Sequence, residues 1–201
     1  MSPKIRGYRR TDLDAVYDIC VRTADAGGDA RGQQSDDRLV GDVFAAPYVT
    51  LEPEVARILD DGSGQAVGYI VGTVNTPEFV RRYREEWMPA IAGRYADDQD
   101  ERDKGLLATH HRPERMLVPE LAGYPAHLHI DLLAEWQGRG QGRALMTSFL
   151  NGLHAAGVPK VHLSMSPANL SARAFYERLG FTPIPVPAER QVLYLGGGTA
   201  V

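Results

Sequence analysis

A glycine-rich loop between a predicted strand and a predicted helix constrains the fold more than any other feature of the sequence. The loop reads Gln137-Gly138-Arg139-Gly140-Gln141-Gly142. Before it, apolar and polar residues alternate from Ala126 to Leu133, which is typical of a half-buried strand. After it, apolar residues recur at helical spacing, at Ala144, Leu145, Phe149 and Leu153. This order predicts a strand, a tight turn and a helix.

Such a turn is suited to an anion, because backbone N–H groups and the helix dipole converge there. A pyrophosphate is the natural ligand, and Arg139 and Arg143 would add positive charge. The loop lacks the Gly-Lys-Ser/Thr ending of a nucleotide P-loop, and its glycines follow GxGxG rather than the dinucleotide pattern GxGxxG. On the loop alone, a tight turn without any ligand remains the alternative.

The rest of the chain predicts a mixed α/β fold. A hairpin is expected from residues 55–59 and 66–74, joined by Asp60-Asp61-Gly62-Ser63-Gly64. Strands and helices then alternate in the second half, which favours a central mixed sheet flanked by helices. The remaining expected elements are a strand over 4–9, a helix from Thr11, a helix over 36–44, a strand over 161–165, a helix opened by Asn169, a strand over 191–195 and a loose tail over 196–201.

Residues 77–124 interrupt this pattern with charged and aromatic helical sequence. They lie between the third and fourth expected strands and contain too few apolar residues for a core of their own. We therefore expect one domain, 1–201, with a helical insertion. Its aromatic residues Phe79, Tyr83 and Trp87 are read as a packing stripe, or as part of an acceptor pocket or a homodimer surface.

Composition narrows the class of partner. The formal charge of −4 offers no basic field for nucleic acid, and no apolar run approaches the roughly 20 residues that span a bilayer. The start, MSPKIRGYRR, has no signal-peptide apolar region. The single cysteine, Cys20, cannot form an internal disulfide. We expect a cytoplasmic protein whose partners are small molecules or proteins, not nucleic acid or membranes.

Two motifs together carry a family resemblance. The segment from Leu132 to Gly142 resembles motif A of the GNAT superfamily of N-acetyltransferases, and the pattern Asn169-x-x-Ala172-x-x-Phe175-Tyr176-x-x-x-Gly180-Phe181 resembles its motif B. The segment 68–74, the helix around Trp87 and the first helix are also similar to the acetyltransferase-like C-terminal domain of eukaryotic protein O-GlcNAc hydrolase. The chain would be a free-standing relative of that domain.

The resemblance implies a GNAT fold, acetyl-CoA as cosubstrate and an N-acetyltransferase activity toward an unidentified amine by direct attack in a ternary complex. The Leu132 N–H would polarise the thioester carbonyl, the loop from Gln137 to Arg143 would hold the pyrophosphate, and Asn169 would line the pantetheine. Cofactor-binding residues are thus Leu132, Leu133, Gln137, Gly138, Arg139, Gly140, Gln141, Gly142, Arg143, Asn169 and Tyr176. An acetyl-CoA-binding pseudoenzyme with a regulatory role is the alternative.

Three residues are candidates for catalysis. Tyr176 aligns with the tyrosine that protonates the departing thiolate in many family members, and is otherwise a structural tyrosine. Asp131 or His129 would act as the general base, or would serve in structural hydrogen bonding. Asp25 and Asp29 are further candidates for the acceptor cleft, or turn residues. No metal site is expected, and His110 and His111 are read as solvent-exposed loop residues.

Overall fold

The computed structural model describes residues 2–95, 100–187 and 192–200. Their centre is a seven-stranded mixed sheet with the order β1-β2-β3-β4-β5-β7-β6, in which only β4 and β5 pair in parallel. The strands are β1 (Lys4–Gly7), β2 (Arg57–Asp60), β3 (Ala66–Thr73), β4 (Ala126–Leu132), β5 (Lys160–Met165), β6 (Thr182–Pro183) and β7 (Leu193–Gly198). The expected mixed sheet and its hairpin, β2–β3, are confirmed.

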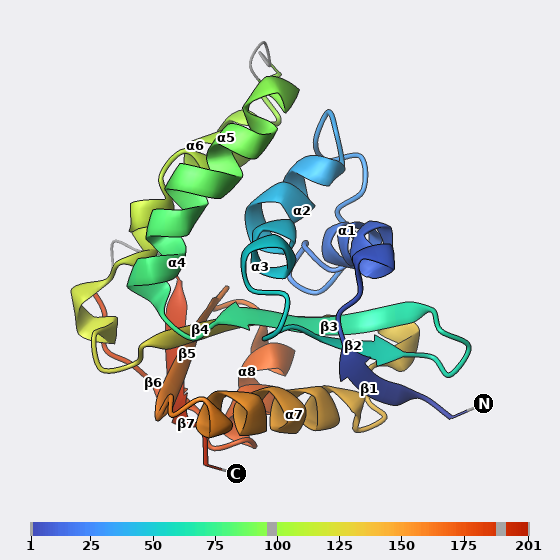
Figure 1. The fold of residues 1–201 in the computed structure, drawn as a ribbon, viewed down its shortest axis with the longest axis vertical. Helices are drawn as coiled ribbons and strands as arrows, with labels where there is room; N and C mark the ends of the chain where they lie inside the picture. Colours follow the sequence, from blue (N-terminus) through green and yellow to red (C-terminus); the bar gives the residue numbers. More distant parts are fainter. Residues whose placement is uncertain (1, 96–99, 188–191, 201) are drawn as a thin grey trace.

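Helices cover both faces of the sheet (Figure 1). In that view α1, α2 and α3 lie above the strands, α7 lies below them, and α4, α5 and α6 extend away at one end. The helices are α1 (Leu13–Val21), α2 (Arg38–Phe44), α3 (Ala46–Leu51), α4 (Thr76–Arg82), α5 (Met88–Ile91), α6 (Lys104–His110), α7 (Gln141–Ala155) and α8 (Leu170–Glu177). Short 3-10 segments and one π-helical turn, Tyr83–Trp87, connect them.

Helix α7 packs closely on the central strands, and a glycine in β3 makes room for it. Its apolar stripe is buried, as the periodicity predicted, with Leu145 and Phe149 at most 1% exposed. Gly72 of β3 lies beneath this helix. A Cβ at Gly72 would lie 2.7 Å from the Phe149 ring and 2.2 Å from the carbonyl oxygen of His127, so only glycine permits this approach.

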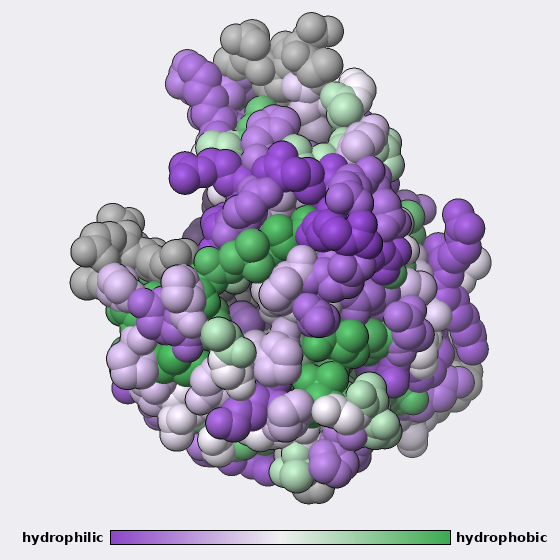
Figure 2. All heavy atoms as spheres, turned by 60° about the vertical axis from the view of Figure 1, so that its left-hand side comes forward, coloured by the Kyte–Doolittle hydropathy of each residue, from purple (hydrophilic) through white to green (hydrophobic). Residues whose placement is uncertain are grey.

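The segment between β3 and β4 is helical, as expected, and its aromatic residues face inward. Phe79, Tyr83 and Trp87 are all at most 5% exposed, so the idea that they form a homodimer surface is wrong. Trp87 donates its indole N–H to the carbonyl oxygen of Asp42 in α2, at 2.9 Å. The outer face carries ion pairs such as Arg81 with Glu78, and the upper part of this side of the molecule is mostly hydrophilic (Figure 2).

Several elements differ from the sequence-based expectations. Helix α3 was not predicted, and α2 begins two residues later than expected. The expectation of a loose tail over 196–201 is wrong for its described part, because Gly196, Gly197 and Gly198 pair with β5 as the end of β7. Thr199 is buried and donates its hydroxyl to the Val158 carbonyl at 2.6 Å. Gln191 and Val201 lie outside the described residues.

The glycines at the end of β7 make room for aromatic rings. A Cβ at Gly196 would lie 2.3 Å from the Tyr124 ring, and one at Gly197 would lie 3.1 Å from Phe181. Glycine has a low intrinsic preference for strands, which is why the sequence suggested a loose tail. Packing of the rings against the bare backbone outweighs that preference here.

Candidate active site

A cleft of about 760 Å³ opens where β4 and β5 separate. The two strands pair only at their starts, at Ala126 with Val161 and at His127 with His162. Beyond that point the ends of both strands line the cleft from opposite sides, with Asp131 and Leu132 from β4 and Ser164 and Met165 from β5. Parallel strands that diverge at their carboxyl ends leave space for an extended ligand between them.

The backbone of β4 turns the N–H and C=O of Leu132 toward this space. Leu133 donates its N–H to the carbonyl oxygen of Val67 on β3, at 3.1 Å. In an antiparallel pair, alternate residues bond to the neighbouring strand, so the N–H and C=O of Leu132 point the other way, toward the cleft. The Leu132 carbonyl accepts a hydrogen bond from the Gln137 side chain at 2.8 Å. Leu133, the other residue of this strand end expected to bind the cofactor, is buried and does not line the cleft.

The glycine loop forms one end of the cleft. Gly138 and Gly140 have φ angles of +71° and +78°, the left-handed region that favours glycine, and a Cβ at either position would meet open space. Gly140 is the N-cap of α7, so the first N–H groups of that helix have no partner within it. The loop residues that line the cleft are Gln137, Gly138, Gly140, Gly142 and Arg143. Arg139 and Gln141 do not line it.

Positive charge at this end is uncompensated. Arg143 lies in the first turn of α7, where the helix dipole disfavours a cation, and that turn contains no acidic residue. Neither Arg139 nor Arg143 has an ion-pair partner among the described residues. A phosphate group would satisfy both the guanidinium of Arg143 and the free N–H groups.

Asn169 and Tyr176 belong to the opposite wall. The Asn169 side chain caps α8 by accepting from the Ala172 N–H at 3.0 Å, and it donates to the carbonyl oxygen of Ala26 at 3.1 Å. It therefore ties the loop after α1 to the start of α8. Tyr176, on α8, points its hydroxyl into the cleft. Burial, followed by the charge of Asp131, raises the pKa of Tyr176, so the phenol keeps its proton at neutral pH.

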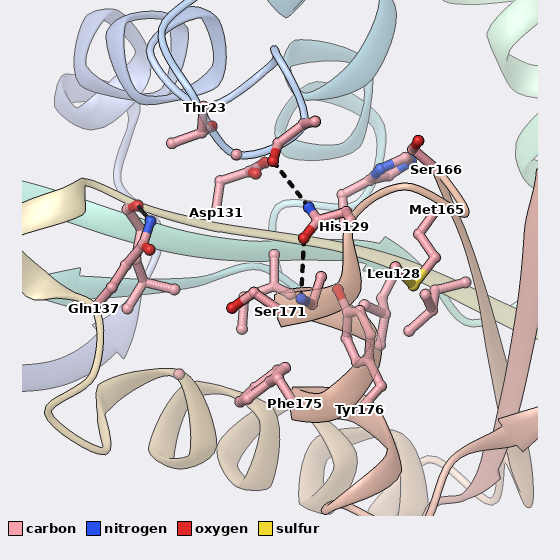
Figure 3. Close-up of a pocket in the computed structure, with 18 of the residues that line it drawn as sticks. Thr23, Leu128, His129, Asp131, Gln137, Met165, Ser166, Ser171, Phe175 and Tyr176 are labelled. Carbon is pink, nitrogen blue, oxygen red and sulfur yellow. Dashed lines mark hydrogen bonds between the residues drawn. The ribbon is translucent and has the colours of Figure 1, made fainter.

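Asp131 lies on the cleft side of β4, beside Thr23 (Figure 3). Its cross-strand partner, Tyr69, donates its hydroxyl to the carboxylate at 2.6 Å. Burial raises the pKa of Asp131 to about 6, against the opposing effects of hydrogen bonds from Tyr69 and Thr23. A carboxylate with this pKa is charged at neutral pH and is more basic than an ordinary aspartate.

His129 lies two residues before Asp131, on the same face of β4. Its Nε2 is 3.2 Å from the Tyr48 hydroxyl, and its ring lies 6.1 Å from the ring of Phe44. Burial lowers the pKa of His129 to about 4, with a further contribution from the positive charge of Arg115. The imidazole is therefore neutral at physiological pH.

Several residues of the site were not identified from the sequence. Tyr69 and Tyr48 contact the two candidate bases, and Cys20, Thr23 and Phe44 line the same end of the cleft. The sequence did offer a signal for Tyr69. A tyrosine in the middle of an otherwise aliphatic strand indicates that its hydroxyl has a buried hydrogen-bond partner. Pairing of Tyr69 with Asp131 depends on the β3–β4 register, which periodicity does not reveal.

Other sequence-based candidates lie elsewhere. Asp29 pairs with Arg31 at 2.6 Å, Asp25 accepts from the Gln33 side chain at 3.2 Å, and neither lines the cleft. The expectation that His110 is exposed is wrong, since it is 3% exposed and lies 2.8 Å from the Tyr83 hydroxyl. No group of three or more His, Cys, Asp or Glu side chains among the described residues is arranged to hold a metal ion.

Comparisons with known proteins agree with this geometry. Residues 101–183 match the acetyltransferase (GNAT) domain. The crystal structure of SsHAT is similar over 100% of both chains, with 58% identity and a TM-score of 0.95. The chain belongs to the GNAT family of acetyltransferases. The GNAT motifs A and B lie at the glycine loop and on α8, the two elements that border the cleft.

Two more distant similarities concern a relative in sequence and a relative in fold. Rat protein O-GlcNAcase is 26% identical over 88% of this GNAT chain, which spans only 20% of that relative. The crystal structure of the PaiA N-acetyltransferase from Thermoplasma acidophilum in complex with coenzyme A shares the fold, with 12% identity, coverage of 98% of this chain and 99% of that chain, and a TM-score of 0.62.

In the described part of the chain, no helix has both the length and the apolarity to cross a membrane.

Proposed function

We propose that the protein is an acetyl-CoA-dependent N-acetyltransferase that acts on an amine. The observation that carries this proposal is the cleft between β4 and β5, which is lined by an anion-binding loop and by the carboxylate of Asp131. The loop suits an anionic pyrophosphate and the carboxylate suits a cationic ammonium group, the two reactants. The coenzyme A complex of the related PaiA fold supports the choice of donor.

The residues of the cleft fit acetyl-CoA. The unpaired N–H groups at the start of α7 and the Arg143 guanidinium would bind the pyrophosphate. The backbone of β4 would pair with the pantetheine arm as an added strand. In this pose the Leu132 N–H would donate to the thioester oxygen and stabilise the negative charge that develops there, typically by a few kcal/mol.

Asp131 would act as the general base. It takes one proton from the acceptor ammonium and passes it to solvent, and the nitrogen lone pair then attacks the thioester carbonyl carbon. The C–N bond forms and the C–S bond breaks. Tyr176 gives its proton to the leaving sulfur and recovers one from the acylated nitrogen, so the products are an amide, a free thiol and one proton.

Substitution Tyr176→Phe tests the enzyme hypothesis directly. We expect turnover to fall by about 100-fold, as for loss of a general acid, while the Kd for acetyl-CoA measured by calorimetry stays within about twofold. Wild-type turnover is first measured with a set of small amines, aminoglycosides, amino sugars and lysine peptides. Saturable acetyl-CoA binding without turnover of any acceptor would contradict the proposal.

A binding module is the second candidate. It is favoured by the relatives named O-GlcNAcase, of which this chain spans only a fifth. A module of that kind would bind acetyl-CoA as a regulatory ligand and transfer nothing. Tyr176→Phe would then leave every measurable property unchanged except local packing, which separates the two candidates.

A further inference from the structure

A chain of hydrogen bonds runs from the backbone to His129 beneath the acceptor end of the cleft. The Pro125 carbonyl accepts from the Thr76 hydroxyl at 2.9 Å. Thr76 Oγ1 lies 2.8 Å from Nδ1 of His127. The Tyr48 hydroxyl lies 2.7 Å from Nε2 of His127 and 3.2 Å from Nε2 of His129. One phenol therefore links two histidines of the same strand.

The Pro125 carbonyl fixes the direction of every bond in this chain. A carbonyl oxygen only accepts, so the single hydroxyl proton of Thr76 points at it. Thr76 Oγ1 must then accept from the Nδ1–H of His127. A neutral imidazole carries one ring proton, so Nε2 of His127 accepts from the Tyr48 hydroxyl. With its only proton used, the Tyr48 oxygen accepts from Nε2–H of His129.

Both imidazoles are neutral, as this chain requires. Burial lowers the pKa of His127 well below its usual value and lowers that of His129 to about 4. The opposite direction of bonding would leave the Thr76 oxygen and the Pro125 oxygen 2.9 Å apart without a proton between them. Two acceptors at that distance repel each other, so the opposite direction is disfavoured.

We infer that this chain locks His129 as its Nε2–H tautomer and presents the Nδ1 lone pair to the cleft, as the acceptor for an N–H of a primary amine substrate. Among the described residues Nδ1 of His129 has no partner, and no unpartnered side-chain nitrogen is buried. Since His129 lines the cleft, the free nitrogen is open to it. The amine-binding role of His129 rests on the proposed function, whereas the tautomer lock does not.

The side chains of Asp131 and His129 on β4 together form a subsite, and both of them act as hydrogen-bond acceptors. Asp131 offers a carboxylate and His129 offers a lone pair, so a bound group must supply at least two hydrogens. A primary amine does so even after losing one proton to Asp131, because two N–H bonds remain. Carboxylates and carbonyl groups, which only accept, find no donor in these two side chains. The subsite therefore selects primary amines over tertiary amines and acidic groups.

The other charged and titratable groups around His129 leave it neutral. Arg115, His127 and His162 face it from the insertion, β4 and β5, and the positive charge of Arg115 disfavours protonation of the ring. Tyr48, on α3, keeps its proton because burial raises its pKa. His162 donates from Nδ1 to the Tyr124 carbonyl at 3.0 Å and is not part of the chain.

Imidazole nitrogen NMR of the full-length protein, labelled with ¹⁵N-histidine, tests the lock without any substrate. At neutral pH we expect His129 as the Nε2–H tautomer and His127 as the Nδ1–H tautomer, each as a single species. His129 as the Nδ1–H tautomer, or a rapidly exchanging mixture, would overturn the inference. Assignment of the two signals uses the single variants His127→Gln and His129→Gln.

Thr76→Val, with Thr76→Ser as the matched control, tests the role of the lock in turnover. The valine variant removes the first link, so we expect the His129 tautomer signal to become mixed. Its kcat with a primary amine should fall about tenfold, the effect of one hydrogen bond, while the Kd for acetyl-CoA is unchanged. The serine variant should match the wild type in all three measurements. Equal tautomer spectra for the two variants would overturn the inference.

Tyr48→Phe breaks the chain at its next link and replaces Thr76→Val if that variant fails to fold. The same mixed tautomer is expected for His129. A wild type that shows the locked tautomer but acetylates no amine would overturn the amine-binding role together with the proposed function, and would still support the lock. A wild type that acetylates amines with the opposite tautomer would overturn the lock and leave the proposed function standing.

Discussion

The surroundings of Asp131 give one carboxyl group two conflicting properties. Asp131 is partly buried on β4, and the Tyr69 hydroxyl donates to it at 2.6 Å. Burial disfavours the charged form, and the pKa rises to about 6. A base of this strength suits proton transfer near neutral pH, but keeping its charge in place at that pH costs stability.

Asp131→Asn should separate these two effects. We expect kcat/KM to fall by about 100-fold or more, because the general base is lost. Wild-type kcat/KM should rise with pH through an apparent pKa of about 6 for a fixed amine, whereas the variant should lack this limb. Initial rates measured across the range from weakly acidic to weakly alkaline pH provide the profile. An unchanged profile in the variant would assign the base elsewhere.

Stability should change in the opposite direction. The folded protein holds the Asp131 proton more tightly than the unfolded chain, whose aspartate has its pKa near the usual 3.8. Stability from this group is therefore fully present below about pH 4 and is lost as pH rises through about 6. An asparagine side chain does not titrate, so Asp131→Asn should raise Tm at about pH 7 and give a smaller gain at about pH 4. Calorimetric scans at the two pH values would show a gap of constant size if the prediction is wrong.

At the scale of elements, a buried carboxylate joins the insertion to α2. Asp42 is fully buried and accepts from the Tyr17 hydroxyl, from the Tyr95 hydroxyl at 2.6 Å and from the Arg94 guanidinium at 2.8 Å. The backbone carbonyl of Asp42 also accepts from Trp87. Arg94, Tyr95 and Trp87 all belong to the insertion, so this cluster holds it against the first helices.

Asp42→Asn should loosen that attachment. The amide keeps one acceptor oxygen for three donors and loses the charge that pairs with Arg94, so we expect a loss of about 2–3 kcal/mol in the free energy of unfolding. Denaturant unfolding with matched m-values measures it. The control is Asp29→Asn, whose ion pair with Arg31 lies in solvent and should contribute nothing measurable. Equal effects of the two substitutions would contradict the account of the cluster.

The sequence predicted those elements whose local pattern agrees with their final packing. The alternation before the glycine loop and the apolar stripe after it identified β4 and α7. The last strand was predicted too early in the sequence, at residues 191–195. Its glycines pack against the rings of Tyr124 and Phe181, which are distant along the chain, so the local sequence does not reveal their place in the sheet. The roles of Tyr69 and Tyr48 in the site were not predicted, for the same reason. The partner of Tyr69 depends on the register of the sheet, and that of Tyr48 on how α3 packs against it.

At the scale of the whole molecule, the cleft divides the sheet into two halves. β1 to β4 lie on one side and β5 to β7 on the other, and only two residue pairs join β4 to β5. Asn169 adds one link across the gap by bonding to Ala26. A ligand that pairs with β4 and binds the α7 N-terminus would bridge the two halves, so binding should stabilise the entire fold.

Acetyl-CoA should therefore raise Tm in a manner that depends on the glycine loop. At a concentration about 100 times its Kd, the ligand would add about 2.7 kcal/mol. For a chain of this size that corresponds to a rise of roughly 5–10 °C. Gly140→Glu should abolish the rise, because it places a negative charge and a strained side chain at the phosphate end of the cleft.

Gly157→Glu is the matched control for this measurement. Gly157 has a φ angle of +76°, close to the +78° of Gly140, and a Cβ there also meets open space, but it follows the far end of α7 and does not line the cleft. Both variants should lose about 1 kcal/mol from backbone strain. Only Gly157→Glu should keep the full shift with acetyl-CoA. An equal loss of the shift in both variants would mean that strain, rather than the anion site, governs ligand binding.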